Sequence, residues 1–352
     1  MVKVAINGFG RIGRIAFRVW LSRPDLQEKL TIVAVNTSGS LAVAGWAHLL
    51  KYDTAYGKLD QEIHVEELKK PDEVSATDAI MGYLTTTGWR VPILAQREPS
   101  KLPWKDYGID VVIEATGKFT SEEAASQHLT AGAKRVLISA PSKGGNIGTY
   151  VLGVNRYVGE QSIADNASCT TNCIAPVVAV IQAKLGILKA GMTTVHAYTD
   201  DQRVQDNSHE DLRRARAAGA NIIPTSTGAA TATTKTIPEL KGLFDGVALR
   251  VPVITGSISD VTCLSKRQTS VEEVNQIFRE AAQGEQWKGI LAVTDEPLVS
   301  SDIIGRSESA IVDLSLTQVI GGDLIKVFAW YDNEWGYANR LMEQAIVLGT
   351  SD

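Results

Sequence analysis

The 352-residue sequence is poor in cysteine, in positive charge and in long apolar runs. Three cysteines, an odd number, argue against a disulfide framework and for a reducing compartment. No run of about 18 apolar residues occurs, which predicts no membrane span, and the N-terminus shows no secretory signal pattern. The net charge of −5 offers no basic footprint for nucleic acid or an anionic membrane. We therefore expect a cytoplasmic globular protein that binds neither.

The first half of the sequence alternates short apolar runs with helical patterns. The runs are apolar throughout, as expected for parallel strands that are covered on both faces. This order predicts an α/β fold, with a Rossmann-type doubly wound parallel sheet over roughly residues 1–150. The predicted strands are 2–7, 31–36, 111–115 and 135–139, and the predicted helices are 11–22, 41–51 and 121–131.

The second half has a different character. A helical pattern at 169–184 precedes the strand MTTVHAYT and a polar, arginine-rich stretch at 200–224 that has no clear period. A stretch of that length inside a compact protein is usually functional or at an interface. The longer strand runs FDGVALRVPVI and SISDVTCL precede a last helical pattern at 336–349. This order predicts an α+β domain with a mostly antiparallel sheet and helices on one face.

A glycine motif, GFGRIG, lies between the first predicted strand and the first predicted helix. Gly8 allows a tight turn, and Gly10 lets a pyrophosphate approach the backbone. Gly13 permits close packing of the helix on the strand, and the helix N-terminus faces the phosphates. The motif in this context predicts dinucleotide binding; a glycine-rich turn without a ligand is the alternative.

The end of the second predicted strand lacks the acidic residue that usually binds the adenosine ribose in such folds. The sequence there reads Asn36-Thr37-Ser38-Gly39-Ser40. Either the fold is not a dinucleotide fold, or the cofactor is not the common one.

Cys169 is predicted to lie in the first turn of a helix, with Ser168 as the N-cap. The unpaired N–H groups and the helix dipole at that position favour thiolate over thiol. Cys173 lies one turn further on, where we expect an inert packed thiol. Three residues separate Cys169 from Cys173 in a C-x3-C pattern, and Cys263 is isolated. No four-ligand set is therefore apparent, and we expect no metal site.

A nucleophilic cysteine needs a base, and the sequence has five histidines. His196 lies on the strand that follows the cysteine helix, where the two side chains can meet. On the pattern alone, a packed or solvated His196 is favoured over a catalytic one. The other four fall in helical or polar contexts that indicate solvated faces: His48, His64, His128 and His209.

Several blocks together resemble the glyceraldehyde-3-phosphate dehydrogenase family, essentially from end to end. They are INGFGRIGR, LLKYD, ASCTTNC, MTTVHAYT, NIIPTSTGAA, LRVPV and YDNEWGY. The resemblance implies that Cys169 attacks the aldehyde and that His196 accepts the hydroxyl proton as hydride leaves for the nicotinamide. It also implies that inorganic phosphate cleaves the resulting thioester. Asn333 would hold the carboxamide of the nicotinamide.

The resemblance further implies two phosphate pockets and a set of cofactor residues. Thr199, Asp201 and Arg250 match the first pocket. Ser168, Thr170, Arg214, Thr227 and Gly228 match the second, although Arg214 belongs to an RRAR run that is alternatively a solvated surface. The cofactor residues are Asn7, Gly8, Gly10, Arg11, Ile12, Gly13, Asn36, Thr37, Ser38, Arg97, Thr116, Gly117, Ser139, Ser208, Asn333 and Tyr337.

The cofactor preference departs from the usual family pattern. The family signature at the second strand end is Asn-Asp, whereas Asn36-Thr37 stands here. Without the carboxylate, the hydroxyls of Thr37, Ser38 and Ser40 are available to a 2′-phosphate. The 200–224 stretch resembles that of the photosynthetic, NADP-using branch, with Ser208 where the NAD-using branch has Pro. The Thr37–Ser40 turn contains no arginine, so we expect NADP or use of both NADP and NAD.

The family implies a homotetramer in which the 200–224 stretch reaches the cofactor of a neighbouring subunit. We expect a dinucleotide-binding domain at 1–167 and 334–352, with the C-terminal helix returning to it, and a catalytic and oligomerisation domain at 168–333. The predicted reaction is the reversible, phosphorylating oxidation of glyceraldehyde 3-phosphate to 1,3-bisphosphoglycerate. Alternatives are oxidation of erythrose 4-phosphate, a cysteine hydrolase that uses Cys169 and His196, and a catalytically silent nucleotide-binding protein.

Overall fold

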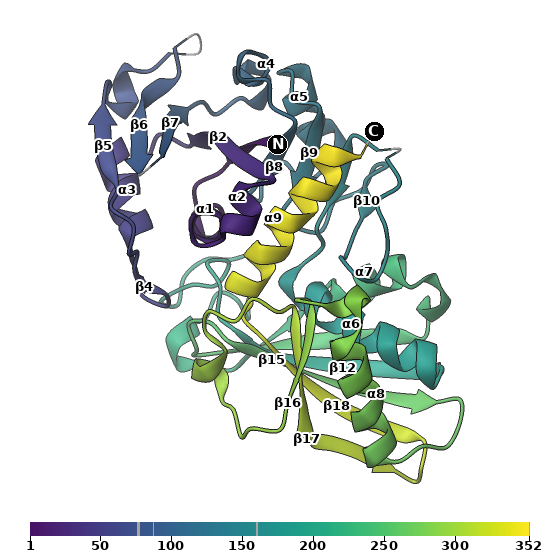
Figure 1. Cartoon of the computed structure of the whole chain (residues 1–352). Helices are drawn as coiled ribbons and strands as arrows, with labels where there is room; N and C mark the ends of the chain where they lie inside the picture. Colours follow the sequence, from purple (N-terminus) through teal and green to yellow (C-terminus); the bar gives the residue numbers. More distant parts are fainter. Residues whose placement is uncertain (76–77, 87, 160, 352) are drawn as a thin grey trace. The chain divides into compact units, whose positions relative to one another are not determined.

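The computed structural model describes residues 1–75, 78–86, 88–159 and 161–351. The chain forms two compact units (Figure 1). Unit 1 comprises Met1–Tyr150, Tyr157–Asn166 and Ala338–Asp352, and unit 2 comprises Val151–Arg156 and Ala167–Tyr337. The segment Val151–Arg156, which we expected in the first domain, belongs to unit 2 because Val151 and Val154 pack with Ala167 and Ala175.

Unit 1 is built on a sheet of nine described strands in the order β10-β11-β9-β8-β1-β2-β7-β6-β5. From β10 to β7 every pairing is parallel, and β6 and β5 add an antiparallel edge. The predicted parallel sheet is confirmed, and the antiparallel edge was not predicted. The strands are β1 Val2–Asn7, β2 Leu30–Thr37, β5 His64–Glu67, β6 Ile80–Thr86, β7 Trp89–Ala95, β8 Val111–Glu114, β9 Arg135–Ile138, β10 Gly148–Thr149 and β11 Ile163–Asp165.

The helices of unit 1 are α1 Arg11–Ser22, α2 Pro24–Gln27, α3 Val43–Lys51, α4 Trp104–Tyr107 and α5 Glu122–Thr130. Three of them, α1, α3 and α5, match the predicted ones within two residues, whereas α2 and α4 were not predicted. Short elements complete the unit: β3 Tyr52–Asp53, β4 Gly57–Lys58, η1 Pro71–Glu73 and η2 Pro99–Lys101.

The last helix, α9 Trp335–Thr350, lies in unit 1 from Ala338 onward. Nη1 of Arg23 donates to Oδ1 of Asn339 at 2.8 Å and to Oε1 of Glu343 at 2.6 Å. These bonds tie the C-terminal part of the chain to the end of α1.

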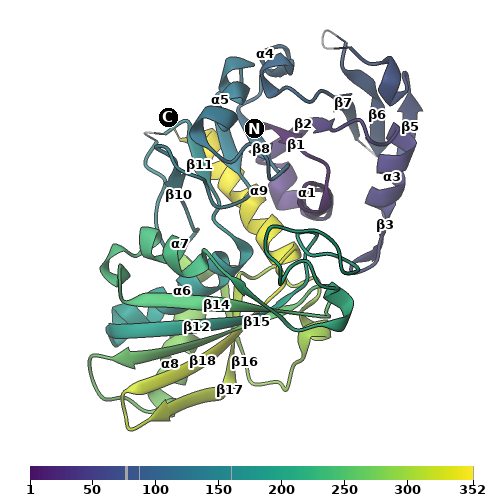
Figure 2. The same cartoon turned by 180° about the vertical axis from the view of Figure 1, so that it is seen from behind.

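Unit 2 contains a sheet of seven described strands in the order β13-β14-β12-β15-β18-β17-β16 (Figure 2). Most pairings are antiparallel, as predicted; β12 with β14 and β16 with β17 are parallel. The strands are β12 Ile187–Ala197, β13 Ile223–Ser226, β14 Phe244–Val251, β15 Ser257–Ser265, β16 Leu291–Thr294, β17 Ala310–Ile320 and β18 Leu324–Tyr331.

The helices of unit 2 cover one face of this sheet. Strands β15 and β18 alternate buried and partly buried residues, so one face of each is covered. The covered face shares one apolar core with α6 and α8, in which Ile174 and Phe278 pack with Val261. The helical elements are α6 Cys169–Lys184, α7 Ala229–Thr236, α8 Val271–Gln283, η3 Ala218–Ala220, η4 Pro238–Leu240, η5 Glu285–Trp287 and η6 Ser300–Ile303. In the part of the chain that the structure describes, no helix is long and apolar enough to cross a membrane.

Candidate active site

Cys169 is the first residue of α6, as predicted, and Ser168 is its N-cap. Oγ of Ser168 accepts a hydrogen bond from the backbone N–H of Thr171 at 3.0 Å. The preceding residue, Ala167, is buried and has a φ of +53°, the left-handed region that favours glycine. Its carbonyl accepts from the hydroxyl of Tyr337 at 3.2 Å. This strained turn places the thiol at the first turn of the helix.

The predicted partner of the thiol lies within hydrogen-bond distance. Nε2 of His196, near the end of β12, lies 3.3 Å from Sγ of Cys169. His196 is 1% exposed, so it is not on a solvated face. The structure thus brings together a thiol and an imidazole that are 27 residues apart in the sequence.

Arg250 lies against the other nitrogen of the same imidazole. Strands β12 and β14 pair in parallel with His196 opposite Arg250. Nδ1 of His196 lies 2.6 Å from Nη1 of Arg250 and 2.6 Å from the carbonyl oxygen of Ala197. A hydrogen on Nδ1 would be donated to the carbonyl and would leave Nε2 as a base toward the thiol. In the other tautomer, Nδ1 accepts a hydrogen bond from Arg250 and the ring hydrogen is on Nε2, which then cannot act as a base toward the thiol.

Burial and the positive charge of Arg250 shift the pKa values of both Cys169 and His196. Burial raises the pKa of the Cys169 thiol, and the positive charge of Arg250 opposes this. Burial, followed by the charge of Arg250, lowers the pKa of His196 to about 3. The sequence indicated the favourable helix start but not this burial. Burial disfavours an isolated thiolate on Cys169 and an isolated imidazolium on His196. Transfer of the proton from Sγ to Nε2 forms both charges side by side, so that each stabilises the other.

Arg214 is half-buried, whereas Arg213 and Arg216 of the same run are exposed. Nη1 of Arg214 donates to Oδ2 of Asp201, and its Nε lies 3.3 Å from Oδ2 of Asp211. The pKa of Arg250 is lowered by burial, with Cys169 and Asp201 raising it and Arg214 lowering it. The basic and acidic residues of the two predicted phosphate pockets therefore lie within electrostatic reach of Arg250.

The hydroxyl-bearing residues of these pockets are placed differently from one another. Oγ1 of Thr227 accepts from the N–H of Ala229 at 3.2 Å at the start of α7, where a Cβ added to Gly228 would meet no atom within 4 Å. The backbone N–H of Thr199 donates to Oε1 of Gln202 at 3.1 Å. In contrast, Thr170 is buried and its Oγ1 lies 3.0 Å from the hydroxyl of Tyr331. The side chain of Thr170 is therefore bound within the core.

The glycine turn of unit 1 has the tight geometry that the motif predicted. Gly8 has a φ of +102°, and a Cβ there would lie 2.7 Å from the backbone nitrogen of Thr116. A Cβ at Gly13 would lie 2.0 Å from the carbonyl oxygen of Gly8, so this contact of helix and turn requires glycine. At Gly10, the N-cap of α1, an added Cβ would meet no atom within 4 Å. The backbone at the start of α1 is thus open to an anionic group, which fits a dinucleotide pyrophosphate.

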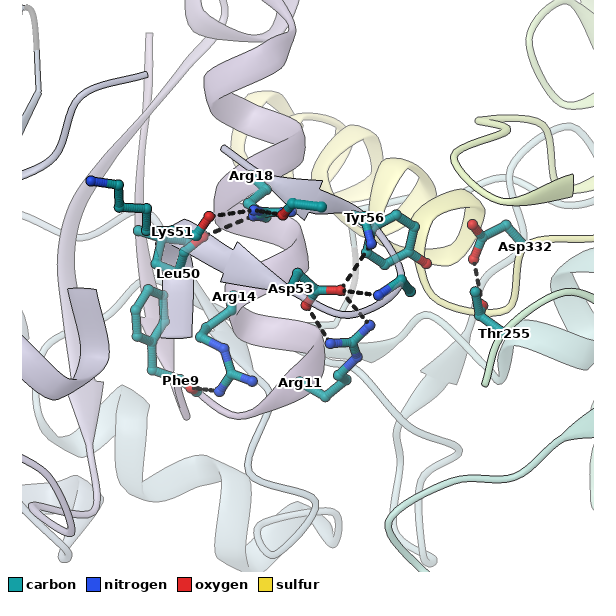
Figure 3. Close-up of polar contacts among 12 residues, drawn as sticks. Phe9, Arg11, Arg14, Arg18, Leu50, Lys51, Asp53, Tyr56, Thr255 and Asp332 are labelled. Carbon is teal, nitrogen blue, oxygen red and sulfur yellow. Dashed lines mark hydrogen bonds and ion pairs between the residues drawn. The ribbon is translucent and has the colours of Figure 1, made fainter. Parts of the chain in front are cut away.

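The side chain of Arg11 is held beside this turn by Asp53, which sequence reasoning did not select (Figure 3). Nη1 of Arg11 bonds to Oδ2 of Asp53, and Nη2 donates to Oδ1 at 3.1 Å. Oδ1 also accepts from the N–H groups of Ala55 and Tyr56 at 2.9 and 3.0 Å. Burial raises the pKa of Asp53, but the bonds from Arg11 and the backbone outweigh it, so the pKa lies below its ordinary value.

At the end of β2, the structure differs from the prediction that the Thr37 hydroxyl is available to a 2′-phosphate. Thr37 is 2% exposed; its hydroxyl donates to the carbonyl of Leu94 at 3.0 Å and accepts from the N–H of Gly39 at 3.2 Å, so both bonds engage it within unit 1. The hydroxyls of Ser38 and Ser40 are exposed and lie 3.0 Å apart. Nε of Arg97 donates to the carbonyl of Ser38 at 3.3 Å. An arginine therefore lies beside the turn, supplied by a residue 59 positions away in the sequence.

Three other predicted cofactor residues have defined environments within their own units. Oδ1 of Asn333 accepts from the N–H of Gly256 at 3.2 Å and the hydroxyl of Ser257 at 2.9 Å, which assigns the other amide atom, Nδ2, as the donor. The N–H of Ser139 donates to the carbonyl of Glu114 at 2.9 Å. Ser208 lies exposed in the long polar stretch of unit 2, and its carbonyl accepts from Arg203 at 2.9 Å.

His128 was assigned to a solvated face, and this was wrong. It is 0% exposed, and its ring contacts Glu114 and Trp104. The apolar residues around Glu114 were a signal that this carboxylate needs a buried partner, but nothing in the local pattern pointed to His128.

Comparisons with known proteins agree with this geometry. The model of the NAD-binding domain of glyceraldehyde 3-phosphate dehydrogenase matches residues 2–122, and the model of its C-terminal domain matches residues 168–333. The chain is 49% identical over 351 residues to glyceraldehyde-3-phosphate dehydrogenase 2 of Synechocystis sp., covering 99% of this chain and 98% of that protein. It is 49% identical to the chloroplastic glyceraldehyde-3-phosphate dehydrogenase A of Zea mays, covering 98% of this chain and 81% of that protein. It is 47% identical to the enzyme of Streptomyces coelicolor, covering 99% and 98%.

Proposed function

Because the chain belongs to the glyceraldehyde-3-phosphate dehydrogenase family, with NAD or NADP as its cofactor, we propose that it catalyses the reversible, phosphorylating oxidation of glyceraldehyde 3-phosphate through a thioester on Cys169. The product is 1,3-bisphosphoglycerate. The observation that carries this proposal is the 3.3 Å distance between Sγ of Cys169 and Nε2 of His196 at the start of α6.

The first half of the reaction uses the thiol and the imidazole. Sγ attacks the aldehyde carbon while Nε2 of His196 takes the thiol proton and passes it to the new oxyanion, which gives a hemithioacetal. The N–H groups at the start of α6 stabilise the oxyanion. Nε2 then takes the hydroxyl proton as the hydride leaves; when bound, the nicotinamide supplies the hydride acceptor. The carbon ends as a thioester.

The second half replaces the thioester by an acyl phosphate. An oxygen of inorganic phosphate attacks the thioester carbon, the C–S bond breaks, and the proton on Nε2 returns to Sγ. Arg250 and Arg214 supply the positive charge for the two phosphate groups, and the open backbone at Gly228 supplies N–H donors. The bond from Arg214 to Asp201 has to exchange for a bond to phosphate during this step.

The protein also uses NADP, in this proposal, and not only NAD. No carboxylate stands at position 37, so a 2′-phosphate meets no charge repulsion there. Arg97 and the exposed hydroxyls of Ser38 and Ser40 are the donors for that phosphate. The buried Thr37 contributes to NADP use only because it carries no negative charge. Asn333 would present Nδ2 to the carboxamide oxygen of the nicotinamide.

The assembly proposed for the protein is a homotetramer. The polar stretch after β12 exposes Val204, Leu212 and Ile222 by 88, 80 and 68%. Apolar side chains exposed on a long, mostly irregular segment are typical of a subunit contact.

A matrix of four assays tests substrate, cofactor and phosphate use together. Formation of reduced cofactor from glyceraldehyde 3-phosphate is followed with NAD or NADP, each with and without inorganic phosphate. Turnover with both cofactors that depends on phosphate is expected. Turnover that is independent of phosphate would exclude the phosphorylating step, and turnover with NAD alone would exclude NADP use.

A further inference from the structure

A buried polar cluster underlies the cofactor turn in unit 1 and takes no part in the reaction described above. Its members lie at the carboxyl ends of three adjacent strands, on α5 and at the start of α4. Each is 4% exposed or less. We call these residues the strand-end cluster: Asn7, Asn36, Trp104, Glu114 and His128.

The hydrogen bonds define the protonation of the histidine. Nε1 of Trp104 lies 3.0 Å from Nδ1 of His128, and an indole N–H only donates. Nδ1 is therefore an acceptor, so the ring hydrogen is on Nε2. Nε2 lies 3.0 Å from Oε2 of Glu114 and donates to it. The two ring nitrogens of His128 thus have distinct roles: Nδ1 accepts from Trp104 and Nε2 donates to Glu114.

The carboxylate of Glu114 accepts hydrogen bonds from two segments of the predicted cofactor site, one at Asn7 and one at Thr116. Nδ2 of Asn7 donates to Oε2 at 2.5 Å. The N–H of Thr116 donates to Oε1 at 2.8 Å, and the Thr116 hydroxyl bonds to the same oxygen. With His128, four donors converge on one buried carboxylate, which satisfies its charge.

The same cluster joins the turn after β1 to the end of β2. Oδ1 of Asn7 accepts from Nδ2 of Asn36 at 2.7 Å, and the N–H of Gly8 donates to the carbonyl of Asn36 at 2.9 Å. The N–H of Ala115 donates to the carbonyl of Asn7 at 2.8 Å. Because Gly8 also approaches Thr116 closely, the glycine turn and the segment after β8 are held in one mutual geometry.

We propose that His128 and Glu114 are positioning residues for the dinucleotide: the Nε2–H to carboxylate bond holds the segments around Gly8 and Thr116 in the conformation that binds the cofactor. The inference rests on the proposed cofactor site. Neither residue is a catalytic residue, since His128 acts through Glu114, and Glu114 acts through Asn7 and Thr116. If the bond is broken, the carboxylate loses one of four donors and its two segments gain freedom, which weakens binding without altering the chemical step.

Two variants of one residue separate this role from simple packing. In His128→Gln, the amide nitrogen stands near the place of Nε2 and still donates to Glu114. In His128→Asn, the amide oxygen stands near the place of Nδ1 and still accepts from Trp104, but the donor to Glu114 is lost. Both variants remove part of a buried ring, so both lower the melting temperature.

Cofactor dissociation constants are measured by calorimetry with NAD and NADP, and kcat is measured at saturating cofactor. Amide hydrogen exchange of 7–10 and 115–118 is followed in the cofactor-free protein. We expect His128→Asn to bind both cofactors about tenfold more weakly, with kcat within about twofold and faster exchange in both segments. His128→Gln should bind within about threefold of wild type.

Equal losses in the two variants, or unchanged dissociation constants with lowered melting temperature, would overturn the positioning role. If His128→Asn does not fold, Glu114→Gln is used in its place. Its amide group would turn an N–H toward the donors of Asn7 or Thr116 and so break part of the network. Unchanged cofactor affinity in Glu114→Gln would also overturn the inference. A wild-type protein that bound neither NAD nor NADP would instead refute the proposed function on which the inference rests.

Discussion

Nη1 of Arg250 lies 2.6 Å from Nδ1 of His196, whose Nε2 faces the thiol of Cys169. A residue proposed to bind phosphate therefore contacts the residue proposed to move the proton. An anion that draws the guanidinium to itself would leave Nδ1 to the carbonyl of Ala197, which favours the tautomer with Nε2 as base. In the proposed mechanism, substrate binding and proton transfer would therefore be coupled through this one imidazole.

Replacing Arg250 by Gln tests that coupling. We expect KM for glyceraldehyde 3-phosphate to rise at least about tenfold, because a charge-assisted bond to phosphate is lost, and kcat to fall as well. The dissociation constant for NAD should stay unchanged, which serves as the control for folding. An unchanged KM would show that Arg250 does not bind the phosphate of the substrate.

Cys169→Ser should abolish dehydrogenase activity while cofactor binding persists, because a hydroxyl is a far weaker nucleophile than a thiolate. Steady-state rates and calorimetric binding of NAD test this. Retained turnover would show that Cys169 is not the nucleophile.

His196→Asn should slow the alkylation of Cys169 at pH 7 by about tenfold or more, because the base that takes the thiol proton is gone. The rate of modification by iodoacetamide is measured, with Cys263 as an internal reference in a mass-spectrometric readout. Cys263 is buried, and burial raises the pKa of its thiol to about 12, so it should stay unmodified. Equal alkylation rates in both proteins would argue against proton transfer to His196.

Thr37→Asp should shift the ratio of kcat/KM values strongly toward NAD, because a carboxylate repels a 2′-phosphate. Thr37→Val is the matched control for charge. It removes the hydroxyl, which donates to Leu94 and accepts from the N–H of Gly39, without adding a charge, and it should leave the ratio within about twofold. Arg97→Gln should weaken NADP binding and spare NAD. A ratio that does not respond to Thr37→Asp would show that position 37 does not select between NAD and NADP.

The ion pair of Arg11 and Asp53 predicts a specific pH dependence of stability (Figure 3). The folded-state pKa of Asp53 lies below its unfolded value, so between the two the unfolded state binds more protons. The stabilising contribution is therefore present above about pH 4 and is lost as the pH falls further. The free energy of unfolding of wild type and Asp53→Asn, measured from pH 7 to pH 2, should converge at low pH. A constant difference would contradict the lowered pKa.

Local patterns in the sequence determined much of the fold. Helices α1 and α6 begin and end at the predicted residues, because periodicity, the Ser168 cap and the glycine turn depend on neighbours along the chain. The same local chemistry placed Cys169 at a helix start and Gly8 in a left-handed turn. Together with the family resemblance, these features were sufficient for the reaction class.

The tertiary structure decided which distant side chains meet. The contact of Arg250 with His196 follows from the register of two parallel strands, and the arginine beside Ser38 comes from the segment after β7. The direction of the Thr37 hydroxyl and the burial of His128 depend on partners 57 and 14 residues away. Sequence periodicity reports which face of an element is covered, whereas the identity of the atom that satisfies a buried donor or acceptor is set only when the elements pack.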